Sequence, residues 1–279
     1  MIQLHARKAL GQHFLTDPKA HERIVKSIAP QPEDILVEIG PGTGLLTKRL
    51  LATPLKKLIA FELDSRAIPK LQEEFEAEEL RLEIVEQDFL DVDLGQLSQR
   101  ETVKLRVAGN IPYYITSPIL FKLIDEREAL RDATLLIQLE VAERLTAQPG
   151  TKAYGIPTVL ANFFGEVKLL FKVPAGAFRP VPKVDSAVIH IDFARGYFSR
   201  LGRTAPEHFD EHYFRKLVRG SFAMRRKTMR NNIKALLGVE AISKLETGAG
   251  NRFLAKRGEA LSIEDFVELS VALYPGNVI

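Results

Sequence analysis

Short apolar segments alternate with amphipathic helical segments from the start of the chain to about Phe193, and this alternation limits the possible folds most strongly. Strands that alternate with helices at such spacing predict a mainly parallel sheet with helices on both faces. A first helix is expected before the first strand, because Asp17 can cap it and Pro18 suits its first position. The predicted strands cover residues 35–40, 58–63, 82–87, 105–109, 134–139, 167–173 and 187–192, and the predicted helices cover 18–28, 45–51, 66–79, 117–125 and 154–164.

The last two predicted strands are separated by a Pro-rich loop without a clear helical pattern, so they could pair antiparallel at one edge. After Asp192 the strand pattern ends, and helices are predicted over residues 210–221, 226–237 and 262–273. Ser262, with Asp265 three positions later, resembles a capping box at the start of the last helix. We therefore expect an α/β domain over residues 1–194, a linker over 195–206 and a small all-α domain over 207–279.

The chain has 279 residues, enough for one large and one small domain with a substantial buried core. It has no cysteine, which excludes disulfides, thiolate zinc sites, iron–sulfur clusters and cysteine nucleophiles, and we predict no metal site. No apolar run approaches the roughly 18 residues that span a bilayer, and the N-terminus lacks the apolar core of a secretory signal. We therefore expect a cytoplasmic monomer without a membrane partner.

The net charge of +3 is distributed unevenly along the chain. From Arg195 to the end there are 15 Lys and Arg against 9 Asp and Glu, whereas the preceding part has 24 against 27. Between His212 and Glu240 there are eight basic residues and no acidic one. This asymmetry favours a polyanionic partner for the C-terminal part, although a solvated helical face would explain the charges equally well.

A glycine-rich turn containing Gly40, Gly42 and Gly44 joins the first predicted strand to the following helix. Glycine at a strand-to-helix turn lets a ligand approach the backbone where a side chain would block it. Glu62 ends the second strand, 22 residues after Gly40, where an acid can accept hydrogen bonds from both hydroxyls of a ribose. Together with the adjacent Leu63, these residues predict a site for a nucleoside cofactor.

Two residues of the turn favour S-adenosylmethionine over a dinucleotide. A dinucleotide fingerprint would place Gly or Ala at position 45, which is Leu45 here, and Pro41 removes a backbone N–H that a pyrophosphate would use. Asp88 ends the third predicted strand, with Phe89 beside it, and its carboxylate can accept a hydrogen bond from the adenine amino group of the cofactor. Each element alone could be a structural turn or a solvated acid, but three at successive strand ends predict a cofactor site.

Asn110, Ile111, Pro112 and Tyr113 follow the fourth predicted strand, and Asn-X-Pro-aromatic at this place is typical of methyltransferases that act on ring-conjugated amino groups. Such an amino group is a poor nucleophile because its lone pair is delocalised. The Asn110 side-chain oxygen and the Ile111 carbonyl could accept its two N–H bonds and direct the lone pair at the methyl donor. Pro112 favours an extended Ile111, and the Tyr113 ring could stack on an extruded base. A simple turn before the next helix is the alternative interpretation.

With these motifs, the chain resembles the bacterial small-subunit (16S) rRNA adenine N6,N6-dimethyltransferase family over nearly its whole length. Residues 8–15 (KALGQHFL) match the N-terminal motif of the family, with His13 where the family often has Asn. Residues 178–186 and 221–232 resemble the loop before the last strand pair and the start of a small helical domain. The resemblance implies a Rossmann-like class I methyltransferase fold, with a seven-stranded, mostly parallel sheet whose last strand is antiparallel.

The resemblance also implies roles for individual residues. Phe178 would lie opposite Tyr113, so that two rings hold the target adenine between them, although Phe178 could instead pack in the core. Asn110 would contact the cofactor, as would three residues of the N-terminal motif: Gln12, His13 and Leu15.

For function, the resemblance implies transfer of two methyl groups from S-adenosyl-L-methionine to each of two adjacent adenines near the 3′ end of small-subunit rRNA. The product cofactor would be S-adenosyl-L-homocysteine, and the expected substrate is a partly assembled ribosomal subunit. Some basic residues could brace the domain interface, but we expect most of the following to contact RNA: Arg7, Lys8, Arg215, Lys216, Arg219, Arg225, Arg226, Lys227 and Arg230.

Three alternatives remain at this stage. The related large-subunit rRNA adenine methyltransferase of macrolide resistance shares the motifs and differs chiefly in its C-terminal domain, and residues 178–186 and 225–232 favour the small-subunit enzyme. The protein could act mainly by binding, as a ribosome-assembly factor, although the intact motif at Asn110 argues for catalysis. A DNA adenine methyltransferase is disfavoured because the chain has no obvious separate domain for reading sequence.

Overall fold

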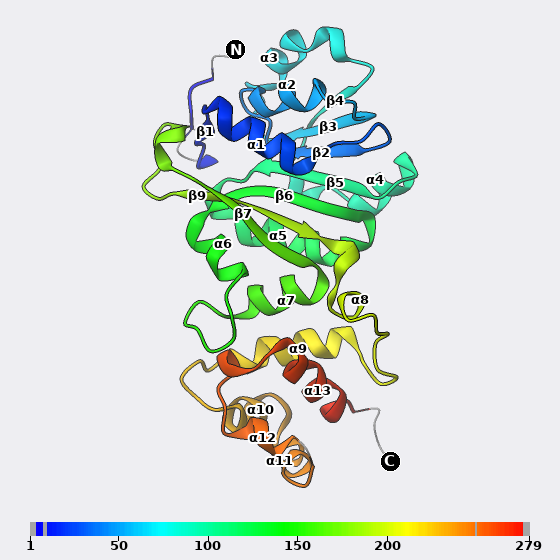
Figure 1. The fold of residues 1–279 in the computed structure, drawn as a ribbon, viewed down its shortest axis with the longest axis vertical. Helices are drawn as coiled ribbons and strands as arrows, with labels where there is room; N and C mark the ends of the chain where they lie inside the picture. The colour runs from blue at the N-terminus through cyan, green and yellow to red at the C-terminus, as the bar shows by residue number, and fades with distance from the viewer. Residues whose placement is uncertain (1–3, 8–9, 249, 276–279) are drawn as a thin grey trace. The chain divides into compact units, whose positions relative to one another are not determined.

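The computed structural model describes residues 4–7, 10–248 and 250–275. Seven strands form its main sheet: β2 (Ile35–Ile39), β3 (Lys57–Glu62), β4 (Leu82–Glu86), β5 (Leu105–Asn110), β6 (Leu130–Gln138), β7 (Glu166–Val173) and β9 (Ser186–Asp192). Their order is β4-β3-β2-β5-β6-β9-β7, as Figure 1 shows. The pairs from β4 to β6 are parallel, whereas β9 runs antiparallel to both β6 and β7. The predicted mostly parallel sheet with an antiparallel last strand is confirmed, as is the antiparallel pairing of the two late strands.

Strand β6 differs most from its predicted range. It begins at Leu130, four residues before the predicted start, and Leu139 begins helix α6 (Leu139–Leu145) instead of ending the strand. The early part was missed because Arg131 and Asp132 look like loop residues. Asp132 is nevertheless buried, and it is stabilised there by an ion pair with Arg106 on the neighbouring strand.

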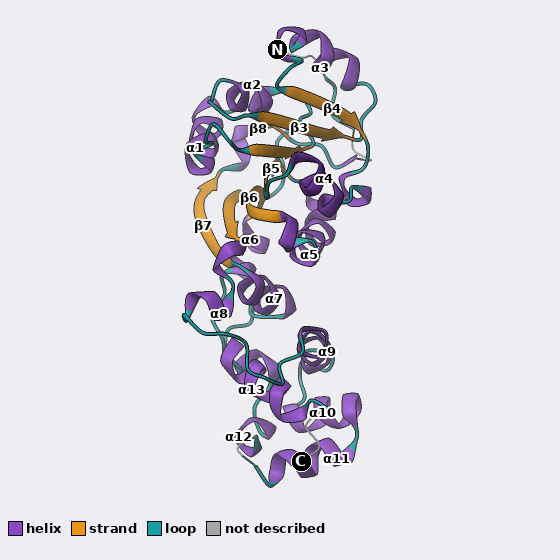
Figure 2. Ribbon diagram, turned by 90° about the vertical axis from the view of Figure 1, so that its right-hand side faces the viewer, coloured by secondary structure: helices purple, strands orange, loops and turns teal. Residues whose placement is uncertain are grey.

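Helices cover both faces of the sheet. Figure 2 shows α1 (Pro18–Ile28) and α2 (Leu45–Leu51) on one side, with α4 (Leu94–Glu101) and α5 (Thr116–Asp125) on the other. Asp17 caps α1 and Pro18 is its first residue, as predicted. Helix α3 (Ile68–Glu74) is shorter than its predicted range, and α4 was not predicted, although Asp93 caps it by accepting a hydrogen bond from the Gln96 N–H. Apolar residues of α1, α2 and α3 pack with β2 and β3 into one core.

The contacts within the chain divide it into two compact units, residues 1–142 with 165–194 and residues 143–164 with 195–279. The second unit is helical, and its core includes a cluster of rings around Phe163, which contacts Phe164, Tyr197, Phe198, Phe209 and Phe214. This division places residues 143–164 with the C-terminal helices, whereas the sequence suggested that they belong to the first domain. Apart from α6, which crosses the boundary, the helices are α7 (Ile156–Phe164), α8 (Tyr197–Arg200), α9 (Glu211–Ser221), α10 (Met229–Leu237), α11 (Val239–Glu246), α12 (Asn251–Leu254) and α13 (Ile263–Leu273).

Two elements of the second unit differ from the predicted ranges. Helix α8 lies inside the range predicted as a linker, and α10 begins at Met229, three residues later than predicted, so Arg226 lies in the preceding loop. Helix α11 was not predicted, although Gly238, with φ of 90°, marks the break that separates it from α10. The capping box of α13 is confirmed, since the Ser262 side chain accepts from the Asp265 N–H and the Asp265 side chain accepts from the Ser262 N–H.

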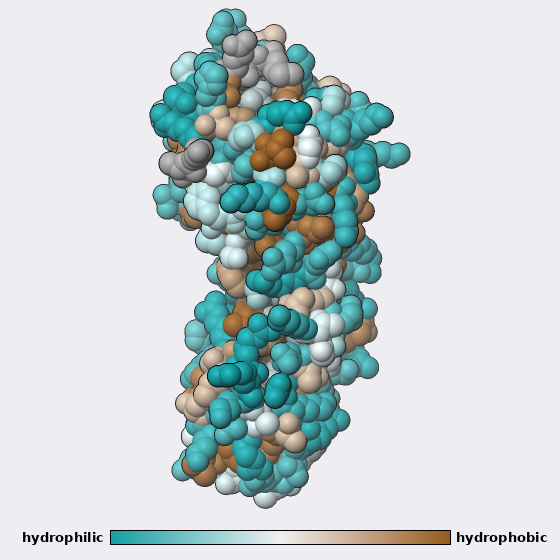
Figure 3. All heavy atoms as spheres, turned by 90° about the vertical axis from the view of Figure 1, so that its left-hand side faces the viewer, coloured by the Kyte–Doolittle hydropathy of each residue, from teal (hydrophilic) through white to brown (hydrophobic). Residues whose placement is uncertain are grey.

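On the face that Figure 3 shows, hydrophilic residues predominate and hydrophobic residues form separated patches. Within the described ranges, none of the helices has the length and apolar character needed to cross a bilayer.

A buried ion-pair network ties α1 and the loop before β2 to β5 and β6. The Arg106 guanidinium lies 2.6 Å from the Asp34 carboxylate and 2.9 Å from the Asp132 carboxylate, and it also donates to the Ile28 carbonyl at 2.6 Å. All three charged side chains are buried. The half-exposed Arg131 also lies 3.1 Å from the Asp34 carboxylate and 3.9 Å from the Asp132 carboxylate, so removing Arg106 would take away the buried cation that these two acids share but not Arg131.

We predict that Arg106→Met lowers the free energy of unfolding by about 3–5 kcal/mol, the usual cost of removing one partner of a buried ion pair. Chemical denaturation followed by circular dichroism measures this. Arg100→Met is the matched control, because Arg100 is half exposed and pairs with Glu83 at the surface, so its loss should cost at most about 1 kcal/mol. Equal effects of the two substitutions would contradict a special role for the buried network.

Candidate active site

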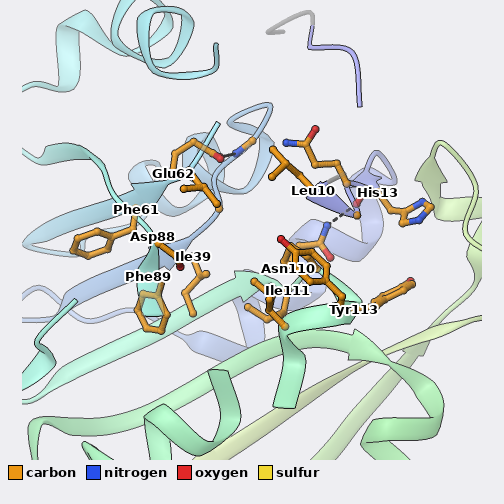
Figure 4. A pocket seen from close by; sticks show the side chains of 18 of the residues that line it. Leu10, His13, Ile39, Phe61, Glu62, Asp88, Phe89, Asn110, Ile111 and Tyr113 are labelled. Atoms are coloured by element: carbon orange, nitrogen blue, oxygen red, sulfur yellow. Dashed lines mark hydrogen bonds between the residues drawn. The ribbon is translucent and has the colours of Figure 1, made fainter. Parts of the chain in front are cut away.

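One cavity lies where β2, β3, β4 and β5 end, and its volume is about 950 Å³ including its open mouth. The carboxyl ends of parallel strands meet at one edge of a sheet, so residues far apart in sequence come together there. Figure 4 shows Glu62, Asp88 and Phe89 on one side of the cavity and Asn110 and Tyr113 on the other. The predicted site residues that line it are Gln12, His13, Gly40, Gly42, Glu62, Leu63, Asp88, Phe89, Asn110, Ile111, Pro112 and Tyr113.

The glycine turn and the acid at the end of β3 are joined directly. Gly40, Gly42 and Gly44 all have positive φ, between 55° and 71°, which L side chains rarely adopt. The Gly42 N–H donates to the Glu62 carboxylate at 2.9 Å, and the Asp64 N–H donates to its other oxygen at 2.8 Å. Burial raises the pKa of Glu62, while these backbone hydrogen bonds oppose the shift. The carboxylate is therefore fixed in place at the cavity wall, where its remaining lone pairs can accept from a ligand.

The end of β4 supplies a second acid with an apolar neighbour. One oxygen of the Asp88 carboxylate accepts from the Leu90 N–H at 2.9 Å, which starts a turn of 3-10 helix. Phe89 is 4% exposed, and its ring packs edge-on against Phe61 with the ring centres 6.2 Å apart. The turn thus places a carboxylate and an apolar surface side by side, an arrangement that suits a planar base with an exocyclic amino group.

The charges of the lining decide what kind of nucleoside fits. The described residues of the lining include the acids Glu62 and Asp88 but no Lys or Arg. A cofactor with phosphate groups would find no cation there, whereas a nucleoside with a cationic sulfonium and an ammonium group would be attracted by the two acids. S-adenosylmethionine therefore fits this cavity better than a dinucleotide does.

The N-terminal segment forms a wall of the cavity. Strand β1 (Phe14–Leu15) pairs antiparallel with β8 (Phe178–Arg179), which anchors the segment to the late Pro-rich loop. The Gln12 side chain accepts from the Arg7 N–H at 2.8 Å and donates to the Asp64 carboxylate at 3.1 Å. Its amide therefore holds the segment over the end of β3, in addition to lining the cavity.

Asn110 has a defined side-chain orientation at the end of β5. Its Nδ2 donates to the backbone carbonyl of His13 at 2.8 Å, so its Oδ1 must point the other way (Figure 4). The Ile111 N–H donates to the Leu136 carbonyl at 3.0 Å, which fixes the peptide beyond it. Within the described part of the chain, neither Asn110 Oδ1 nor the Ile111 carbonyl accepts a hydrogen bond. The site thus holds two acceptors without donors.

The Tyr113 side chain is held by a hydrogen bond at its hydroxyl and by a ring stacked on its face. Its hydroxyl shares a 2.8 Å hydrogen bond with the Ser186 hydroxyl, and burial raises its pKa. The His13 ring stacks on it with the centres 5.7 Å apart and the planes 22° apart, and the His13 Nδ1–H donates to the Pro180 carbonyl at 2.8 Å. A base between two rings needs about 7–8 Å, twice the optimal carbon–carbon contact distance. One of the two rings must therefore move before a base can lie between them.

Phe178 is not at the cavity. Its side chain is fully buried in the core with Leu15, Val173 and Ala177, so its predicted position opposite Tyr113 is wrong for this conformation. The alternative, packing in the core, describes what is observed, because pairing of β8 with β1 turns the ring inward.

Two other predicted cofactor residues are not among the residues that line this cavity. Leu15 is buried, and Gly44 is the N-cap of α2, packed against the Phe75 ring. Sequence reasoning missed several residues of the lining, most of which are neighbours of predicted ones: Leu10, Gly11, Phe14, Ile39, Phe61, Gln87, Tyr114 and Ile115.

The residues predicted to contact RNA fall into two groups, those whose side chains already have a partner within the protein and those whose side chains have none among the described residues. Arg215 pairs with Glu211 and lies over the Phe164 ring, Arg225 bonds to the Lys152 carbonyl, and Arg230 pairs with Glu246. Arg7 is exposed, and Lys8 lies outside the described residues. The remaining four are exposed and have no ion pair or hydrogen bond from their side chains within the described ranges: Lys216, Arg219, Arg226 and Lys227.

Comparison with known proteins connects this geometry to a family. Residues 3–270 match the family described as ribosomal RNA adenine dimethylase. The chain is 41% identical to ribosomal RNA small subunit methyltransferase A of Geobacter metallireducens, over 97% of this chain and 96% of that protein.

Two solved structures are similar over most of the chain. A dimethyladenosine transferase from Plasmodium falciparum has a TM-score of 0.77 and 28% identity, over 92% of this chain and 96% of the other. The 23S rRNA methyltransferase ErmE has a TM-score of 0.63 and 25% identity, over 93% of this chain and 99% of the other.

Glu38 in β2 lies behind the glycine turn and is 1% exposed. It accepts a hydrogen bond from the Thr47 hydroxyl at 2.7 Å, and it lines a smaller cavity with His21, Gly40 and Asn110. Burial raises the pKa of Glu38 from about 4.5 to about 8, and the nearby Glu62 charge adds to this effect. At neutral pH the native protein therefore holds a proton on Glu38 that the unfolded chain would release.

We predict that Glu38→Gln changes how stability depends on pH, because glutamine can accept from Thr47 but cannot ionise. Between about pH 4.5 and pH 8 the native wild type binds this proton and the unfolded wild type does not. As pH rises through this range, the free energy of unfolding of the wild type should therefore fall by up to about 1.4 kcal/mol per pH unit relative to that of the variant. Urea denaturation of both proteins from pH 5 to pH 8.5 measures the difference. Parallel pH profiles would show that Glu38 is ionised in the native state.

Proposed function

The chain belongs to the ribosomal RNA adenine dimethylase family, and on this basis we propose that it dimethylates the N6 amino groups of two adjacent adenines near the 3′ end of small-subunit rRNA. The observation that carries the proposal is the pair of unsatisfied acceptors, Asn110 Oδ1 and the Ile111 carbonyl, beside a cavity lined by two acids. S-adenosyl-L-methionine would supply the methyl group from its sulfonium. Glu62 and Asp88 would bind its ribose hydroxyls and its adenine amino group.

The chemistry assigned to the protein is mainly orientation. Asn110 and Ile111 would accept the two N–H bonds of the target amino group and favour a pyramidal nitrogen, whose lone pair then points toward the cofactor half of the cavity. The Tyr113 ring would stack on the extruded base. No strong general base is needed, because the amine becomes acidic on methylation and its proton can pass to water.

The choice of the small subunit rests on the relatives. The chain shares 41% identity with a small subunit methyltransferase and 25% with the 23S rRNA methyltransferase, and nothing favours the second substrate. Such a substrate would place the enzyme in the cytoplasm, where it would meet a partly assembled subunit. The residues from 207 on would bind the RNA, with 195–206 as a linker from the catalytic domain. A role in assembly by binding is compatible with catalysis.

We predict that Asn110→Ala lowers kcat/KM for methyl transfer to small ribosomal subunits by about 100- to 1000-fold, the usual effect of removing one positioned transition-state contact. Transfer of a labelled methyl group to purified subunits from cells that lack the enzyme measures this rate. Asn110→Asp is the matched variant, because it keeps a side-chain acceptor but loses the donor that bonds to the His13 carbonyl, so we expect intermediate activity.

The same assay tests the substrate and the role of binding. Label that entered only the large subunit would contradict the proposal. An Asn110→Ala variant that still binds small subunits normally would show that binding and catalysis are separable.

We further predict that the exposed cations without a side-chain partner among the described residues bind RNA phosphates. Arg226→Ala and Lys227→Ala should each reduce the slope of log Kd against log salt by about 0.7–0.9, the change for one lost phosphate contact. Arg230→Ala serves as the control, because its guanidinium is already paired with Glu246 and its loss should change the slope less. Binding to small subunits measured at several salt concentrations gives the slopes, and unchanged slopes for all three variants would place the RNA elsewhere.

A further inference from the structure

Tyr114 follows the catalytic tetrapeptide directly, yet the reaction described above does not use it. Its side chain is 57% exposed, although it lines the cavity with Tyr113. Within the described part of the chain, its hydroxyl forms no hydrogen bond. A large aromatic ring that is neither buried nor bonded at the mouth of a site is a candidate for ligand contact.

The Tyr114 ring rests on the backbone of Gly11. A Cβ atom built on Gly11 would come within 3.0 Å of Tyr114 Cδ1 and 3.2 Å of Cε1, which is tighter than nine in ten Cβ contacts in real proteins. Gly11 also has φ of 54°, a conformation that favours glycine. A residue with a side chain would displace the ring, so Gly11 supports one side of it and leaves much of the rest open to solvent.

The two adjacent tyrosines point in different directions. Both belong to a short 3-10 helix, Tyr113–Ile115, in which successive side chains are about 120° apart. Tyr113 turns inward, where its hydroxyl meets Ser186. Tyr114 is 57% exposed and lines the same cavity, so a strand that delivers one base to Tyr113 can bring its next nucleotide to Tyr114.

We propose that Tyr114 is a stacking platform for the nucleobase next to the target adenine. The inference rests on the proposed function and deepens it. Every base has a flat face, and aromatic side chains hold single-stranded RNA in this way without reading its sequence. There are two adjacent target adenines. During transfer to one of them, the base on Tyr114 would be the other adenine, and during transfer to the second it would be the nucleotide that follows the pair in the same direction. Tyr114 would thus position the strand, whereas Asn110 and Ile111 orient the reacting amino group.

The test compares Tyr114→Phe, which keeps the ring, with Tyr114→Leu, which keeps apolar bulk but has no flat face. We expect Tyr114→Phe to match the wild type in transfer to small subunits. Tyr114→Leu should raise KM for the subunit by about 5- to 150-fold, the usual contribution of one stacked base, with little change in kcat or in the Kd for S-adenosylmethionine. Leu80→Ala is the surface control, because Leu80 is 93% exposed and does not line the cavity.

A second measurement separates stacking from general damage. The substrate is a small subunit reconstituted with an rRNA 3′ fragment that lacks the base beside the target. We expect the wild type to have a higher KM for this subunit than for the intact one, whereas Tyr114→Leu should have the same KM for both, because the substitution and the missing base remove the same contact. Effects that multiply, or a Tyr114→Leu variant with wild-type KM, would overturn the platform and leave the proposed function intact. A wild-type protein that transfers no methyl group to small subunits would overturn both.

Discussion

The hydrogen bond from Asn110 Nδ2 to the His13 carbonyl is the interaction on which the candidate active site depends most. It joins the end of β5 to the N-terminal segment, which lies 97 residues earlier in the sequence. It also decides which end of the Asn110 amide faces the cavity, because the amide has one donor end and one acceptor end. With the donor end occupied, the acceptor end is directed at the place where a target amino group would sit. The pairing of β1 with β8 supports the same segment from its other side.

The electrostatics of the cavity follow from burial and from the absence of Lys and Arg in its described lining. Backbone N–H groups of Gly42 and Asp64 stabilise the Glu62 carboxylate against the burial that raises its pKa. Burial raises the pKa of Glu38 to about 8, and among the described residues only the Thr47 hydroxyl donates to its side chain. Glu38 is 1% exposed and Glu62 5%, and the backbone N–H groups of Gly42 and Asp64 donate to Glu62, so the Glu62 carboxylate is the better stabilised of the two acids.

The sheet and most of the site could be predicted from sequence because both depend on local patterns. Apolar runs place β2, β3 and β5 within a residue of their observed ends, and the residues that follow these strands must meet at one edge of a parallel sheet. Two predictions failed because a distant contact decides the conformation. Asp132 looks like a loop residue until Arg106 pairs with it inside the sheet, and Phe178 turns into the core because β8 pairs with β1. Neither partner can be recognised from the neighbouring residues.

The stacking of His13 on Tyr113 follows from contacts that are equally distant in sequence, and it changes how the target base must enter. The ring of His13 is anchored through Nδ1 to Pro180, and the ring of Tyr113 is anchored through its hydroxyl to Ser186. A base that enters between the two rings must displace one of them, and a displacement that breaks its anchoring hydrogen bond costs about 0.5–1.5 kcal/mol. Stacking of the base on the freed Tyr113 ring can offset this cost, since such contacts contribute about 1–3 kcal/mol. The closed arrangement is thus compatible with catalysis, provided that the base itself supplies the energy that separates the rings.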